Sequence, residues 1–149
     1  MSKATKIIII SCATVMIAGL LIWDVPRNKV QLYLEKDTIE KAALDYLNAE
    51  KQKDVKAVYA LLAPSSDYKR NHSYEQYLQD IAANSPLSIN DYKITRIYRL
   101  RDNDNPKNYP AVDKFVQVEV EFVFAHSGPN SIYNYSFTFL KEQGKWYKG

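Results

Sequence analysis

The stretch 112–140 most constrains the fold, because apolar and polar residues alternate on both sides of a short polar segment. Side chains point alternately to opposite faces of a strand, so this pattern predicts two antiparallel strands joined by a turn at 126–130. One face of the predicted hairpin carries Val116, Val118, Val120, Phe122, Phe124, Tyr133, Tyr135, Phe137 and Phe139. A sheet with one apolar face needs a cover, which the helices predicted upstream would supply.

Three segments before the hairpin have apolar residues at helical spacing. The first is predicted to begin near Asp37, the second after Asp54 and the third after Ser73, all residue types that favour helix N-caps. Pro64 is expected to end the second helix. The polar residues 65–72 are predicted to form a loop.

Beyond the third helix the apolar period changes to two. Segment 92–101 predicts a strand, with a bulge near Arg96 where the alternation of faces breaks. Gln143 and Gly144 predict a tight turn before a last strand that begins at Lys145. The order predicts an α+β fold: an N-terminal membrane helix, then about three helices packed on a curved antiparallel sheet of about four strands.

Residues 7–23 form an almost continuously apolar run that follows Lys3 and Lys6. The run is longer than the roughly 7–15 apolar residues of a signal peptide and reaches the roughly 17 needed to span a bilayer. We therefore predict a signal anchor or signal peptide over 1–24. A juxtamembrane connector follows over 25–36, since Pro26 is expected to break the helix, and the α+β domain occupies 37–149. Within the connector, Val30, Tyr33 and Leu34 could extend the next helix backwards at helical spacing.

This arrangement predicts a single-pass protein of a bacterial cell membrane, with its domain outside the cytoplasm. A secreted protein is one alternative. Another is a lipid anchor through Cys12, because the sequence around it resembles a lipobox. The rest of the chain has no cysteine, which excludes disulfides and a thiol nucleophile there.

The net charge of +3 owes two charges to Lys3 and Lys6, so the remainder is nearly neutral. A nucleic-acid partner is therefore not expected. The basic residues of segment 92–101 are interpreted as a charged edge strand, which discourages unwanted pairing.

Three stretches together suggest a family: AALDYL at 42–47, KDVKAVYALL at 53–62 and FTFLKEQGKW at 137–146. They resemble the nuclear transport factor 2-like, cystatin-like α+β superfamily. The resemblance is closest to non-catalytic exported lipoprotein-like domains and to the N-terminal extension of methicillin-resistance-type penicillin-binding proteins. It implies a curved sheet around a cone-shaped pocket under the helices. It implies no particular activity, because the superfamily includes isomerases, dehydratases, hydrolases and scaffolds.

The predicted inner faces of the hairpin contain no carboxylate, since Glu119 and Glu121 fall on the other face. Asp45 is the best helical candidate for a general base, but it lies off the apolar stripe. His72 and His126 lack metal-ligand spacing to each other or to an acid. The sequence therefore predicts no catalytic residue, no metal site and no cofactor.

The leading functional prediction is a non-enzymatic, membrane-anchored domain that serves as a protein-interaction or accessory module of the cell envelope. An envelope protein is its expected partner, and no oligomeric state is predicted. One alternative is a pocket for a lipid or aromatic ligand. The interpretation that competes with it is a core without a pocket, filled by the same side chains. A second alternative is a lyase or isomerase, which would need a buried acid/base pair. The candidate ligand-binding residues are Tyr46, Tyr59, Tyr77, Tyr98, Tyr133 and Tyr135.

Overall fold

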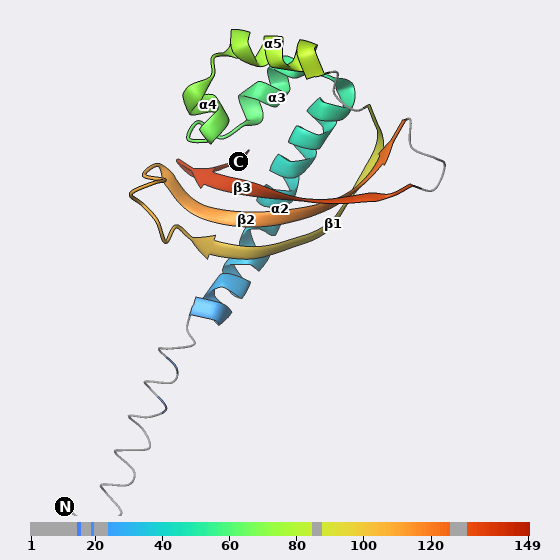
Figure 1. Ribbon diagram of the computed structural model, residues 1–149. Coiled ribbons are helices and arrows are strands. Elements are labelled where there is room, and N and C mark those ends of the chain that lie inside the picture. Colours follow the sequence, from blue (N-terminus) through green and yellow to red (C-terminus); the bar gives the residue numbers. More distant parts are fainter. Residues whose placement is uncertain (1–14, 16–18, 20–23, 85–87, 126–130) are drawn as a thin grey trace, which may run out of the picture.

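The computed structural model describes residues 15, 19, 24–84, 88–125 and 131–149. It confirms the predicted α+β class (Figure 1). The described helices are α2 (Asp24–Gln52), α3 (Val55–Leu61), α4 (Asp67–Asn71) and α5 (Tyr74–Asn84), and the strands are β1 (Ile89–Asp102), β2 (Val112–Phe124), β3 (Tyr133–Glu142) and β4 (Lys145–Lys148).

The four strands form one antiparallel sheet in the order β1-β2-β3-β4. β2 and β3 pair in the predicted hairpin, with Val118 opposite Phe137 and Val120 opposite Tyr135. The strands bend around α2, but the sheet stays open, because β1 and β4 do not pair with each other (Figure 1).

Two local predictions about the strands are confirmed. The register of β1 against β2 shifts between Ile94 and Arg96, where the bulge was expected. Gln143 and Gly144 both have positive φ angles, 49° and 77°. Two successive positive φ angles are typical of the tight hairpin turn that joins β3 to β4.

Helix α2 is continuous from Asp24 to Gln52. The prediction that Pro26 breaks the helix, and that a new helix begins near Asp37, is therefore wrong. The hydrogen bond that a proline removes is the one to the residue four positions before it, so the helix that follows Pro26 loses none of its own bonds. Asp37 is an exposed residue inside the helix, so its spacing to Glu40 does not mark a start.

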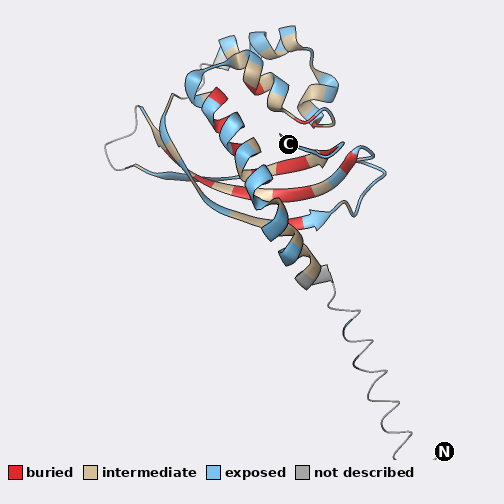
Figure 2. Cartoon of the chain, turned by 180° about the vertical axis from the view of Figure 1, so that it is seen from behind, coloured by how far each residue is buried: buried red, intermediate tan, exposed pale blue. Residues whose placement is uncertain are grey.

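The core forms where α2 crosses the middle of the sheet (Figure 2). Ile39, Ala43 and Leu47 project from α2 and are at most 1% exposed. They belong to one buried cluster with valines of β2 and with Phe139 of β3. Burying a side chain such as leucine or isoleucine contributes about 1.5–3 kcal/mol. The small Ala43 gives the helix room to lie close to the strands.

The short helices depend on their caps. Asp54 accepts the backbone N–H of Ala57 at 2.9 Å, and Ser73 and Gln76 exchange hydrogen bonds at 2.7 and 3.3 Å. Both predicted helix starts are thus confirmed. The predicted loop 65–72, however, contains α4. This single turn has no apolar period to reveal it and is capped by Ser66.

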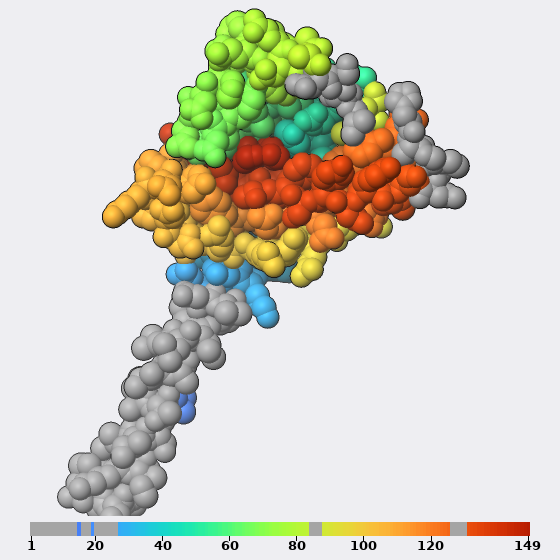
Figure 3. Space-filling view, in the orientation of Figure 1, coloured from blue at the N-terminus to red at the C-terminus, as the bar shows by residue number. Residues whose placement is uncertain are grey.

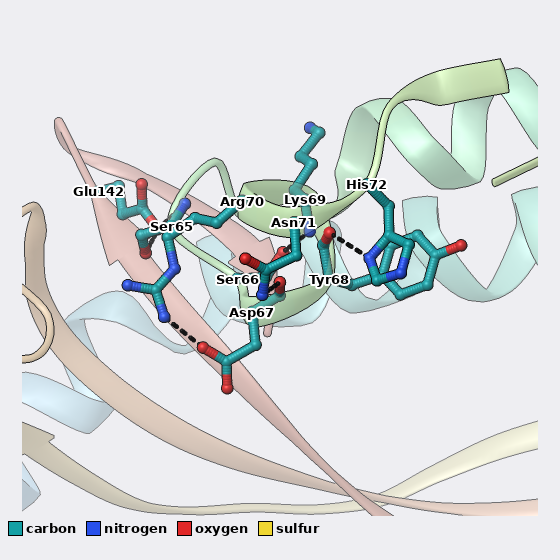
Figure 4. A network of polar contacts seen from close by, with 9 residues as sticks. All are labelled: Ser65, Ser66, Asp67, Tyr68, Lys69, Arg70, Asn71, His72 and Glu142. Carbon is teal, nitrogen blue, oxygen red and sulfur yellow. Dashed lines mark hydrogen bonds and ion pairs between the residues drawn. The ribbon is translucent and has the colours of Figure 1, made fainter. Parts of the chain in front are cut away.

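The chain between α3 and α4 is tied to the end of the sheet. Glu142 of β3 is 4% exposed and accepts hydrogen bonds from the backbone N–H and the hydroxyl of Ser65 (Figure 4). The backbone N–H of Ala63 donates to the carbonyl of Lys148 at 2.7 Å. The end of β4 is therefore partly covered by this segment.

The signal anchor predicted at 7–23 lies outside the described residues, apart from Val15 and Gly19. Within the part of the chain that the structure describes, no helix combines the length and apolar character needed to cross a membrane.

A charged clamp joins the N-terminal half of α2 to the sheet. Lys114 of β2 and Lys141 of β3 lie opposite each other, and Glu35 accepts hydrogen bonds from them at 2.7 and 2.6 Å. Burial alone would raise the pKa of Glu35, but the hydrogen bonds and positive charges of the two lysines outweigh it and lower that pKa.

Replacing Glu35 by glutamine leaves two facing lysines without their shared carboxylate. We expect the free energy of unfolding at about pH 7 to fall by about 1.5–3 kcal/mol, the range for hydrogen bonds to charged groups. The control Asp45→Asn breaks an exposed pair with Lys41 on the same helix and should cost about 0.5 kcal/mol or less. Urea unfolding of the full chain in nonionic detergent measures both. Equal losses of unfolding free energy in the two variants would contradict a stabilising role of the clamp.

The clamp also predicts a pH dependence. The folded-state pKa of Glu35 lies below its ordinary value of 4.5. Its stabilisation is therefore complete above that value and is lost as the pH falls through the folded-state pKa. Between about pH 7 and about pH 3, the wild-type chain should lose more stability than the Glu35→Gln variant. Parallel urea titrations at the two pH values give the comparison, and identical losses would argue against this role.

Candidate functional site

A groove of ≈ 280 Å³ opens between the C-terminal half of α2 and the end of the sheet where β2 and β3 approach their turn. Figure 3 shows α2 in teal between the green helices and the orange strands. We call this recess the aromatic groove. It is lined by Tyr46, Leu47, Glu50, Ile89, Phe122, Phe124, Tyr135 and Phe137.

Simple periodicities bring these residues together. Tyr46 and Glu50 are four residues apart, so they share one face of α2. Phe122 and Phe124 share one face of β2, while Tyr135 and Phe137 of β3 lie in register with the buried valines beside them. One wall of the groove is therefore helical and the other belongs to the sheet.

The aromatic side chains are only partly covered at this end of the sheet. Tyr133 and Tyr135 are each 44% exposed, although the alternation placed them on the same inner face as the buried Phe139. The reason is that the last turns of α2 lie over β1, where Lys51 contacts Asp91, and leave the start of β3 partly uncovered. Tyr133 packs against Phe124 with ring centroids 5.5 Å apart and so borders the groove.

The groove has one polar corner. The hydroxyl of Tyr46 donates a 2.6 Å hydrogen bond to Oε1 of Glu50. The carboxylate at this corner comes from α2, where the sequence had offered Asp45 as the best candidate acid. Glu50 extends the apolar stripe of α2 by one turn from Tyr46, and this spacing could have revealed it. In the sequence Glu50 begins the polar stretch 50–53, which interrupts the apolar stripe of this helix.

Burial, followed by the charge and the hydrogen bond of Glu50, raises the pKa of Tyr46 far above its ordinary value of 10.0. Burial has the opposite effect on a cation and lowers the pKa of Lys148. The charge of Glu50 offsets this lowering only in part. The Lys148 ammonium lies 5.9 Å from the ring centroid of Tyr46 and 5.6 Å from that of Phe137. At neutral pH Tyr46 thus keeps its proton and donates a hydrogen bond to Glu50. This arrangement suits fixed recognition of a ligand better than proton transfer.

The six tyrosines proposed as ligand-binding residues do not share one site. Tyr46 and Tyr135 line the aromatic groove, and Tyr133 borders it. Tyr98 lies on the opposite face of the sheet, where its hydroxyl is 3.2 Å from that of Ser136. The remaining two, Tyr59 and Tyr77, pack together in the helical layer.

That helical layer accounts for several of the tyrosines. The ring centroid of Tyr59 is 5.2 Å from that of Tyr74 and 5.3 Å from that of Tyr77, and Tyr68 lies 5.6 Å from Tyr77. Helix α5 was predicted to bury one apolar side, yet its Leu78 is 41% exposed. The helix packs on the tyrosines of α3 and α4 instead of on the sheet.

Other candidate residues from the sequence lie elsewhere. Asp45 is exposed and pairs with Lys41 at 2.7 Å. The ring of His72 stacks on Tyr68 with centroids 4.4 Å apart, and its Nδ1 lies 3.1 Å from the Tyr68 carbonyl (Figure 4). His126 and Cys12 lie outside the described residues. Among the residues that are described, no group of three His, Cys, Asp or Glu side chains is placed to hold a metal ion.

Two larger recesses have a different chemistry. One, of ≈ 450 Å³, lies between α2 and β1 and is lined partly by Lys29, Lys36 and Arg96. The other, of ≈ 420 Å³, lies beside α4, and its polar groups largely satisfy one another, as in the 2.8 Å ion pair between Arg101 and Asp104. The first also has apolar walls, from Leu32, Ile94 and Ile97, but Tyr33 is its only aromatic residue among those that line it. Neither gathers several aromatic rings around a single carboxylate, as the aromatic groove does.

Comparisons of the chain with protein-family models, with curated proteins and with solved structures find no match. The resemblance to the nuclear transport factor 2-like superfamily therefore stays a prediction.

Proposed function

We propose that this chain is a non-enzymatic domain that binds a small, largely apolar molecule in the aromatic groove. The observation that supports this function best is the partial exposure of the Phe124, Tyr135 and Phe137 rings beside a polar corner. Exposed apolar patches of this kind are typical of binding sites, and ligand sites combine apolar walls with few, well-placed polar groups.

The size of the groove limits the ligand. Its ≈ 280 Å³ lies near the lower end of the roughly 300–1,000 Å³ found for small-molecule sites. A ligand of this size has about one ring or a short branched alkyl group. The hydroxyl of Tyr46 and the carboxylate of Glu50 would meet its polar end.

We further propose that residues 7–23 hold the domain at a bacterial cell membrane as a single-pass anchor, with the domain outside the cytoplasm. The continuous apolar run and its flanking lysines support this location. Secretion and a lipid on Cys12 are the alternatives. The run is followed directly by α2, whose N-terminal turns extend beyond the sheet on the side of the chain's N-terminus (Figure 1).

A specific surface favours interaction with an envelope protein as a second candidate function. Val30, Tyr33 and Leu34 are 59%, 81% and 71% exposed. Their spacing places them on one face of α2, in the part of the helix nearest the predicted anchor. Apolar helix faces of this kind can pack against a helix of another protein.

The groove can be tested with a small neutral aromatic probe, 4-fluorobenzyl alcohol, followed by fluorine NMR on the full chain in nonionic detergent. We expect the probe signal to broaden with the wild-type chain. Ile89→Trp should abolish that broadening, because Ile89 lines the groove and a larger ring would fill it. The matched control is Ile97→Trp on the same strand, which faces the recess between α2 and β1. Equal broadening in the two variants would refute binding in the groove.

The second candidate function predicts a contact at Tyr33. A photo-crosslinking amino acid at this position should give an adduct with an envelope protein in whole cells. The adduct should disappear when Leu34 is also replaced by glutamate, because the apolar face would then carry a charge. The same crosslinker at the exposed Lys56 of α3 serves as the control. An adduct that persists with the glutamate, or that forms equally from Lys56, would exclude this surface.

A further inference from the structure

The rings of the aromatic groove form a box and not a flat stack. Phe122 and Phe124 of β2 are nearly parallel, at 10°, and so are Tyr135 and Phe137 of β3, at 16°. The two pairs meet edge to face. The interplanar angle is 75° between Phe122 and Tyr135 and 89° between Phe122 and Phe137. Tyr46 approaches from α2 at 61° to Phe137.

Three of these rings, those of Phe124, Tyr135 and Phe137, are partly exposed and line the groove. The face of an aromatic ring carries a partial negative charge that attracts cations within about 6 Å of its centroid. The carboxylate of Glu50 adds a full negative charge at one corner. Its Oε1 accepts the Tyr46 hydroxyl, and among the described residues no hydrogen-bond donor meets Oε2.

The protein already places one ammonium against these rings. Nζ of Lys148, on β4, lies 5.6 Å from the centroid of Phe137 and 5.9 Å from that of Tyr46. Lys148 is not among the described residues that line the groove. The same rings and the same carboxylate would therefore attract a cation from solution.

From this arrangement we propose that the aromatic groove binds an alkylated ammonium group, held by its ring faces and by the carboxylate of Glu50. This inference deepens the proposed function and rests on it, because it names the chemical class of the ligand. A primary ammonium would need about three hydrogen-bond acceptors, and the groove offers few. A methylated ammonium needs none, since its methyl groups pack on the rings while its charge is stabilised by them.

The nearby lysine has a defined effect in this scheme. Lys148 and the ligand would carry like charges around Tyr46 and Phe137, so the lysine weakens ligand binding. Replacing Lys148 by methionine keeps an apolar side chain of similar length and removes that charge. The affinity for a cationic ligand should then rise severalfold, while the affinity for a neutral ligand of the same shape stays unchanged.

The experiment compares choline with 3,3-dimethylbutan-1-ol, its neutral isostere, on the full chain in dodecyl maltoside, a detergent without ammonium groups. Dissociation constants are measured from the NMR shifts of the protein's aromatic signals. We expect choline to bind at least about tenfold more tightly than the isostere, as cation–π attraction in a partly desolvated site predicts. Glu50→Gln should remove most of that preference, and the matched control Asp45→Asn, at an exposed carboxylate of the same helix, should keep it.

The outcomes separate the inference from the function on which it rests. Equal affinity for choline and the isostere would overturn the ammonium inference and leave binding in the groove intact. Binding of neither molecule would overturn both. A preference for choline that survives Glu50→Gln would overturn the role of Glu50. The comparison of the two ligands on the wild-type chain needs no variant, so it stands even if Glu50→Gln fails to fold.

Discussion

The contact between one face of α2 and the middle of β2 supports the rest of the structure. Ile39, Ala43 and Leu47 are fully or almost fully buried against the valines at 116, 118 and 120. Side chains in such a core are close-packed, so their positions fix both the height and the direction of the helix. Tyr46, directly before Leu47, and Glu50, one turn after Tyr46, are placed with the same accuracy.

The groove exists because this contact does not extend over the whole sheet. The last turns of α2 lie over β1, where Lys51 contacts Asp91. The aromatic side chains of β2 and β3 at this end keep the alternation that serves the core elsewhere. Where the helix covers them, as at Phe139, they are buried; where it does not, as at Tyr135, they are about half exposed. The candidate site is thus the edge of the core. It has the same alternation of side chains as the core, but α2 does not cover it.

Local patterns predicted much of this fold. The hairpin follows from strict alternation, the caps at Asp54 and Ser73 from side chains that bond their own helix, and the tight turn from Gly144. What the sequence did not reveal depends on contacts distant along the chain. Glu50 resembles part of a polar break until α2 is seen to continue past Tyr46 over the sheet. The tyrosines look alike in sequence, and only the layer that each one joins separates Tyr46 from Tyr59 and Tyr98.

One helix connects all of these features. The face with Val30 and Tyr33 lies near its N-terminal end, the Glu35 clamp follows, the core contacts come next, and Glu50 forms the wall of the groove near its C-terminal end. A continuous helix rises about 1.5 Å per residue, so Glu50 lies about 30 Å from Val30 along one axis. Because the clamp and the core each fix α2 to β2 and β3, the groove keeps its shape independently of what the exposed face near the N-terminus contacts. Ligand recognition and attachment can therefore occupy opposite ends of one rigid element without competing for the same residues.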